Sequence, residues 1–129
     1  MDKWEIKPLI SVGPIKFGMS RKDLHDLFEE KCKEFKKTKY SKNTTDDYGK
    51  FHVYYTPDDL VDAVEIFEGI ELTMNGNVIF PIKVSEIEKK ITGIEKDGNS
   101  YTHIEKSIGI EAGADAIDSI LIGAKGYYG

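Results

Sequence analysis

The sequence contains little cysteine and little histidine, and this shortage limits the sites that it can build. Its only cysteine, Cys32, cannot form a disulfide within the chain, and its three histidines, His25, His52 and His103, are scattered. Zinc sites in small proteins use closely spaced sets of these residues. We therefore expect no metal and no cofactor, and we interpret Cys32 as a buried thiol in a helix rather than as a nucleophile.

Long hydrophobic runs are missing as well. The first ten residues, MDKWEIKPLI, contain no apolar segment followed by a cleavage site, and no stretch approaches the length of a transmembrane helix. We therefore expect a cytoplasmic protein with no membrane partner. The net charge of −5 argues against a nucleic-acid partner, so we interpret the lysines and aromatic residues of KEFKKTKYSK (33–42) as a solvated helix end.

What the chain does contain is the composition of a globular protein. Its 129 residues are 40% hydrophobic and 32% charged, and a chain of this length buries a sizeable core without disulfides or metals. We expect one domain over residues 1–129.

The stretch GPIKFGMS (13–20) raises the question of whether its glycines bind a phosphate. We interpret it instead as the corner between a strand and a helix, with Ile15 and Phe17 packed inside and Gly18 permitting the bend. Ser20 is a suitable N-cap for the helix that follows. Apolar residues at helical spacing predict that this helix covers residues 21–37.

The middle of the chain alternates in the manner of strands. KFHVYY (50–55), LVDAVEIF (60–67) and GIELTM (69–74) are predicted strands, and Asn75–Gly76 is a strong signal for a two-residue hairpin turn. After Pro81 the spacing becomes helical from 84 to about 93, and Ser85 with Glu88 resembles a capping box. Residues 100–112 and 115–123 are again predicted strands.

The sequence also contains an internal repeat. Residues 17–28 match residues 80–91 at an offset of 63, and VDAVEI (61–66) matches IDSILI (117–122) at an offset of 56. We predict two strand–helix–meander repeats, at about 10–69 and 70–129. The predicted fold is α+β, with one antiparallel sheet and two helices on one face.

Two resemblances follow from these motifs. The segment IKFGMSRKDLHDLF (15–28) resembles the tandem helix-plus-meander repeat of beta-lactamase inhibitor protein and of small bacterial outer-membrane assembly lipoproteins, although the chain has no signal peptide, lipobox or disulfides. The layout GPIKFGMS, NGNVIF (75–80) and KGYY (125–128) resembles a family of small uncharacterised bacterial cytosolic proteins. That resemblance brings no catalytic residues, and it implies a role like that of an immunity protein.

Charge is distributed unevenly along the chain. Residues 46–71 contain eight acidic residues and one lysine, a net charge of −7, whereas residues 31–42 contain six lysines and one glutamate, a net charge of +5. An acidic row beside an aromatic residue suits a basic partner. The predicted partner-binding residues are Asp58, Asp59, Asp62, Glu65, Phe67 and Glu68.

We therefore expect a protein-binding module without enzyme activity, most concretely an immunity protein that occludes the basic active-site groove of a bacterial toxin. The alternative interpretation of the acidic row is a solvated surface that binds no partner. The alternative function is a small-ligand-binding or regulatory domain that uses the crevice between the repeats.

Overall fold

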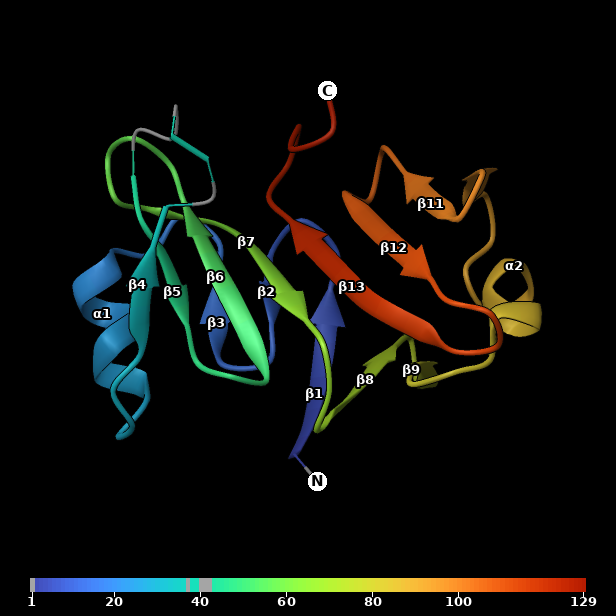
Figure 1. The fold of residues 1–129 in the computed structure, drawn as a ribbon, viewed down its shortest axis with the longest axis horizontal. Helices are drawn as coiled ribbons and strands as arrows, with labels where there is room; N and C mark the ends of the chain where they lie inside the picture. Colours follow the sequence, from blue (N-terminus) through green and yellow to red (C-terminus); the bar gives the residue numbers. More distant parts are fainter. Residues whose placement is uncertain (1, 37, 40–42) are drawn as a thin grey trace.

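The computed structural model describes residues 2–36, 38, 39 and 43–129. Strands make up 49% of these described residues, which contain only two short helices and form an α+β architecture built on two sheets (Figure 1). Among the described residues, no helix is long and apolar enough to cross a membrane.

The first sheet has five strands in the order β3-β2-β1-β8-β9. Within it, β1 pairs antiparallel with β2 and parallel with β8. The expectation of one antiparallel sheet is therefore wrong. The two helices are too short to cover a large sheet, and a second sheet supplies the second layer of the core instead. The bounds are β1 (Asp2–Lys7), β2 (Ser11–Val12), β3 (Ile15–Lys16), β8 (Ile70–Met74) and β9 (Asn77–Phe80).

The second sheet has eight strands in the order β10-β11-β12-β13-β7-β6-β5-β4, and every neighbouring pair is antiparallel. It consists of two four-stranded meanders, which meet where β7 pairs with β13. The bounds are β4 (Lys33–Phe35), β5 (Thr45–Asp47), β6 (Phe51–Tyr55), β7 (Val61–Ile66), β10 (Glu95–Asp97), β11 (Ser100–His103), β12 (Ile108–Ala112) and β13 (Ile117–Gly123).

The first helix, α1 (Arg21–Leu27), begins as predicted, because the Ser20 side chain accepts a hydrogen bond from the backbone N–H of Asp23 at 3.1 Å. Its predicted end at residue 37 is wrong. The chain becomes extended at Phe28, whose ring packs against Trp4, Tyr48 and Phe51. This aromatic packing outweighs the helical spacing of the residues that follow.

The second helix is also shorter than predicted. A 3₁₀ turn over Val84–Glu86 leads into α2 (Ile87–Lys90), and neither segment has a side-chain cap, so the predicted capping box is wrong. Gly93, with a φ of 87°, lies just beyond the helix. In Figure 1, α1 and α2 lie at opposite ends of the molecule.

Two predicted turns are confirmed. Gly18, with a φ of 86°, bends the chain between β3 and α1, and Ile15 beside it is completely buried. Asn75 and Gly76 have φ angles of 52° and 80°, and they connect Met74 to its partner Asn77 as a two-residue hairpin. Positive φ at both central residues is the geometry that the Asn-Gly pair favours.

The core lies between the two sheets and receives one buried residue from each helix. Ile6 and Leu72 enter it from the five-stranded sheet, and Val64 enters it from the eight-stranded sheet. Leu24 of α1 and Ile87 of α2 belong to the same buried cluster. One face of the eight-stranded sheet is thereby covered, and we call its other side the outer face.

Candidate functional site

A buried carboxylate is the centre of the most elaborate polar cluster in the described structure. Asp46 in β5 has no exposed surface. Its Oδ1 lies 3.3 Å from Nη2 of Arg21, and its Oδ2 lies 2.7 Å from Nε2 of His25. Tyr55 donates its hydroxyl hydrogen to the same Oδ2. A buried charge needs such partners, because desolvation without them costs several kcal/mol.

Arg21 connects this cluster to the turn between β6 and β7. Its guanidinium lies 4.0 Å from the centre of the Tyr55 ring and also forms an ion pair with Asp59 at 3.2 Å. Burial alone lowers the pKa of Arg21, but the negative charges of Asp46 and Asp59 and the contact with Tyr55 outweigh it and raise that pKa. The guanidinium is therefore held permanently charged.

Cys32 lies beside this cluster, in the segment between α1 and β4 rather than in a helix as predicted. Its Sγ is 3.8 Å from Nε2 of His25. Burial, together with the negative charge of Asp46, raises the pKa of the Cys32 thiol. In addition, the same imidazole nitrogen faces both the thiol and the carboxylate, so the histidine cannot relay a proton between them as in a catalytic triad.

The same three side chains do, however, offer a set of metal ligands. Nε2 of His25, Sγ of Cys32 and a carboxylate oxygen of Asp46 all lie within 4.8 Å of one another. Sequence spacing did not indicate this set, because a single cysteine, a single histidine and a distant aspartate form no recognised motif. One available signal was the four-residue spacing of Arg21 and His25, which places both on one side of a helix.

The predicted acidic row is divided by the structure. Asp58 and Asp59 lie in the turn before β7, and Glu68 lies in the turn after it, so they are separated by the length of that strand. Asp58 and Glu68 are exposed. Asp59 is also exposed, but it accepts a hydrogen bond from Asn43 besides its ion pair with Arg21.

Glu65 lies on the outer face, as its alternation with Val64 and Ile66 predicts, but it is half-buried there. Its carboxylate accepts hydrogen bonds from the hydroxyls of Tyr54 and Ser119. This side chain therefore holds neighbouring strands together, in addition to any role toward a partner.

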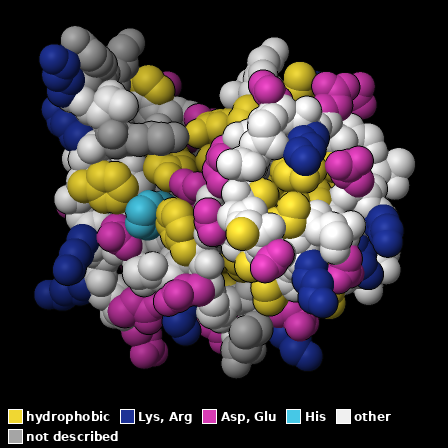
Figure 2. Space-filling view, turned by 45° about the vertical axis from the view of Figure 1, so that its right-hand side comes forward, with side chains coloured by type: hydrophobic (Ala, Val, Ile, Leu, Met, Phe, Trp, Pro, Cys, Tyr) yellow, Lys and Arg dark blue, Asp and Glu magenta, His cyan; other side chains and the backbone are white. Residues whose placement is uncertain are grey.

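Phe67 belongs to a group of aromatic rings on the outer face of the first meander. The His52 ring lies 4.6 Å from that of Phe67 and 5.2 Å from that of Phe35. Asp47 approaches His52 to 3.3 Å. We call Phe35, His52 and Phe67 the aromatic patch. On the face of the molecule shown in Figure 2, acidic side chains lie directly beside hydrophobic ones.

Asp62, the remaining predicted residue, is half-buried in β7, and burial raises the pKa of its carboxyl. Nearby, the C-terminal residues Tyr127 and Tyr128 pack on Tyr54, Ala63 and Leu121 of the outer face. The outer face is thus covered by the tail at the junction of the meanders.

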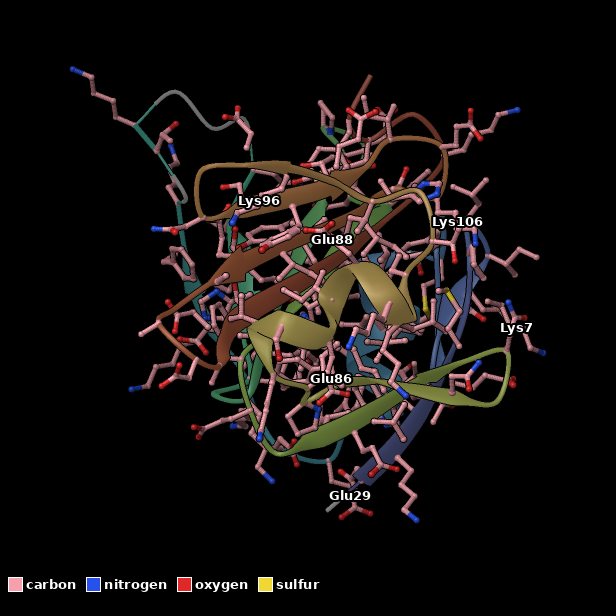
Figure 3. All side chains as sticks on the ribbon, turned by 90° about the vertical axis from the view of Figure 1, so that its right-hand side faces the viewer. Lys7, Glu29, Glu86, Glu88, Lys96 and Lys106 are labelled. Carbon is pink, nitrogen blue, oxygen red and sulfur yellow. The ribbon has the colours of Figure 1, made fainter. Side chains whose placement is uncertain are left out.

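A hollow of about 800 Å³ lies beside α2 in the second half of the chain. In Figure 3, Glu88 lies on the side of α2 that faces Lys96, and Glu86 lies on the opposite side. Both Glu88 and Lys96 line the hollow, which also contains Tyr101. The hollow, which Asp115 also lines, therefore combines lysines, two acidic residues and an aromatic ring.

Comparison with known proteins gives no relative: no family model, curated protein or solved structure matches this chain.

Proposed function

We propose that this chain is a protein-binding module that captures a partner with a basic surface. The observation that carries the proposal is the aromatic patch on the outer face. Two of its three rings, His52 and Phe67, belong to the segment of net charge −7, which has exposed acids in its turns. Aromatic residues are enriched where proteins bind one another, and complementary charge accelerates association.

More concretely, we propose an immunity protein that occludes the basic active-site groove of a bacterial toxin domain. A basic active-site groove can be occluded by a negatively charged protein surface that the toxin cannot use as a substrate. The raised pKa of the Cys32 thiol and the ion-paired carboxylate of Asp46 argue against a nucleophile or a general base at this cluster. In this proposal the protein is cytoplasmic, is not an enzyme, and binds neither nucleic acid nor membranes.

We also propose that the domain, residues 1–129, is a tandem repeat, with the boundaries near residues 10–69 and 70–129. Backbone hydrogen bonds support it. The Arg21 N–H donates to the Asp59 carbonyl at 3.0 Å, and the Val84 N–H donates to the Asp115 carbonyl at 2.9 Å. The donors differ by 63 residues and the acceptors by 56, which are the two offsets of the sequence repeat.

The strand order supports the same proposal. In each half, a hairpin of the five-stranded sheet is followed by a helix and then by a four-stranded meander. Each meander has a register shift between its third and fourth strands, at Tyr54/Tyr55 and at Glu111/Ala112. Leu24 and Ile87 enter one core cluster, which supports placing both helices on one face of the eight-stranded sheet.

For the alternative function, a small-ligand-binding or regulatory domain, we propose a location other than the crevice between the repeats. The hollow beside α2 is the feature that favours it, whereas the junction between the halves is covered by Tyr127 and Tyr128. The test is an NMR titration with small anionic metabolites. Shifts of the backbone amide signals around Lys96 and Tyr101 would favour this alternative.

The test of the protein-binding proposal begins with capture from the native host and identification by mass spectrometry. Association rates of the purified partner are then measured at low and high salt. The test variant neutralises Asp58, Asp62 and Glu68, and it leaves Asp59 and Glu65 in place because they hold the fold together.

A matched control neutralises three exposed acids of the second half, Glu95, Asp97 and Glu105. We expect only the first variant to slow association and to reduce its dependence on salt, since surface charges steer within a Debye length of about 8 Å. Equal rates for both variants at every salt concentration would overturn the proposal.

A further inference from the structure

We propose that His25, Cys32 and Asp46 bind one transition-metal ion of the zinc type. Their donor atoms, an imidazole nitrogen, a sulfur and a carboxylate oxygen, come from three separate segments of the first half: α1, the connection that follows it, and β5. The fold brings these atoms to within 4.8 Å of one another. This proposal is independent of the protein-binding function.

The chemistry of the donors selects the class of metal. Imidazole and thiolate favour zinc and similar ions, whereas Mg²⁺ and Ca²⁺ require sites built mostly from oxygen atoms. Three protein ligands leave a fourth tetrahedral position for water or for a side chain of a partner. On binding, a metal–sulfur bond replaces the S–H bond of Cys32, and the proton passes to the solvent.

One of the ligand distances is already close to that of a tetrahedral site, and small movements would bring the remaining ligand atoms into range. Ligand atoms around zinc lie roughly 3.3–3.7 Å apart, given bonds of about 2.0–2.3 Å. The Cys32–His25 distance of 3.8 Å is already near that range. The His25–Asp46 distance of 2.7 Å is a hydrogen bond. The metal would replace the shared proton, which passes to the solvent, and would increase the distance between the two ligand atoms by roughly 0.6–1.0 Å.

Two neighbouring side chains orient the carboxylate for this role. Arg21 pairs with Oδ1 of Asp46, and Tyr55 donates to Oδ2, which is the oxygen that faces His25. Hydrogen bonds of this kind fix the direction of a ligand before the metal arrives. The His25 side chain is 40% exposed, so an ion can reach the site from solvent.

The experiment is a titration of the intact, reduced protein with Co²⁺, which reports thiolate ligation by a charge-transfer absorption in the near ultraviolet. We expect saturation at one equivalent, displacement by Zn²⁺, and a rise in melting temperature with Zn²⁺ because the ion binds the folded chain. Mg²⁺ at the same concentration is expected to give neither effect.

Two variants identify the ligands. Cys32→Ser should abolish the charge-transfer band, and His25→Gln should weaken Co²⁺ binding by at least about tenfold, because even residues that only orient ligands have effects of that size. The matched control is His52→Gln. It disrupts a second histidine–aspartate pair, that of His52 with Asp47, which does not belong to the proposed set of metal ligands.

The folded state of each variant is checked by circular dichroism, and Tyr55→Phe, which keeps the ring, provides a further variant if His25→Gln unfolds. Loss of the Tyr55 hydrogen bond to Asp46 should weaken binding about 10–100-fold. The proposal is overturned if the wild type gives no charge-transfer band, or if Cys32→Ser binds Co²⁺ as tightly as the wild type.

Discussion

Glu65 of β7 lies directly opposite Leu121 of β13, at the seam where the two meanders of the eight-stranded sheet meet. A carboxylate at such a position would ordinarily be solvated. Here it accepts hydrogen bonds from Tyr54 and Ser119, and the tail residues Tyr127 and Tyr128 pack on the same face. The acid is thus part of the structure of the seam.

This arrangement predicts unequal effects of neutralising two acids of the same segment. Glu65→Ala should lower the free energy of unfolding by about 1–3 kcal/mol, because it leaves the hydroxyls of Tyr54 and Ser119, two buried residues, without their acceptor. Glu68→Ala, at an exposed site, should change it by no more than about 0.5 kcal/mol. Urea denaturation of both variants measures the difference, and similar values would show that the Glu65 hydrogen bonds contribute nothing.

The Asn75–Gly76 turn gives a prediction that depends on backbone conformation alone. A side chain at Gly76 would meet no atom within 4 Å, but the residue has a φ of 80°. Gly76→Val should therefore destabilise the fold by at least about 1 kcal/mol through strain. Asn77→Val, next to it on an exposed position of β9, serves as the control and should be close to neutral. Thermal melts of the two proteins should differ clearly, and coincident melts would rule out strain at the turn.

The tail gives a prediction about alkaline pH. Burial, with smaller effects of Tyr127, Glu65 and Glu111, raises the pKa of Tyr128 to about 12. The docked tail therefore favours the neutral phenol. Its stabilising contribution is complete below the ordinary tyrosine pKa of about 10 and is lost as the pH rises through about 12.

Gly109 provides the means to test this. A Cβ at Gly109 would lie 1.8 Å from the Tyr128 hydroxyl oxygen, so Gly109→Ala should displace the ring and return one tyrosine pKa toward about 10. Ultraviolet titration of the tyrosines measures this pKa, and the Tyr128→Phe variant assigns the signal of Tyr128. An unchanged titration curve in Gly109→Ala would mean that the ring is not held over Gly109.

The buried ion pair predicts the largest single effect. Asp46→Asn leaves Arg21, whose side chain is only 14% exposed, without its buried counter-charge, and loss of one partner of such a pair costs about 3–5 kcal/mol. Asp47→Asn removes the adjacent, partly exposed acid, and its cost should stay below about 1 kcal/mol. Equilibrium unfolding of both variants is the measurement. Equal losses would contradict the assignment of Asp46 as the centre of the cluster.

Local signals in the sequence predicted the local structure well. The N-cap at Ser20, the corner at Gly18 and the hairpin at Asn75–Gly76 each depend on one or two residues with a specific backbone preference. Alternation also placed Val64 and Ile66 in the core. These features need no information from distant parts of the chain.

The misses have a common cause, which is contact between distant segments. The helix expected to reach residue 37 ends at Leu27 because Phe28 packs against Trp4 and Phe51. In the same way, Asp46 and His25 meet only after β5 has joined the sheet and α1 has docked on the core. No spacing in the sequence encodes that meeting, so the polar cluster could not be predicted.

The parallel pairing of β1 with β8 determines when these strands can pair during translation. Asp2 lies opposite Ile70 and Glu5 lies opposite Thr73. During translation, the hairpin of β2 and β3 and the first meander can form early, but one edge of β1 must wait until β8 has left the ribosome. Pairing across so long a stretch of chain is slow to form. A nascent chain arrested before residue 70 therefore exposes an unpaired strand edge, the kind of surface that chaperones protect from aggregation.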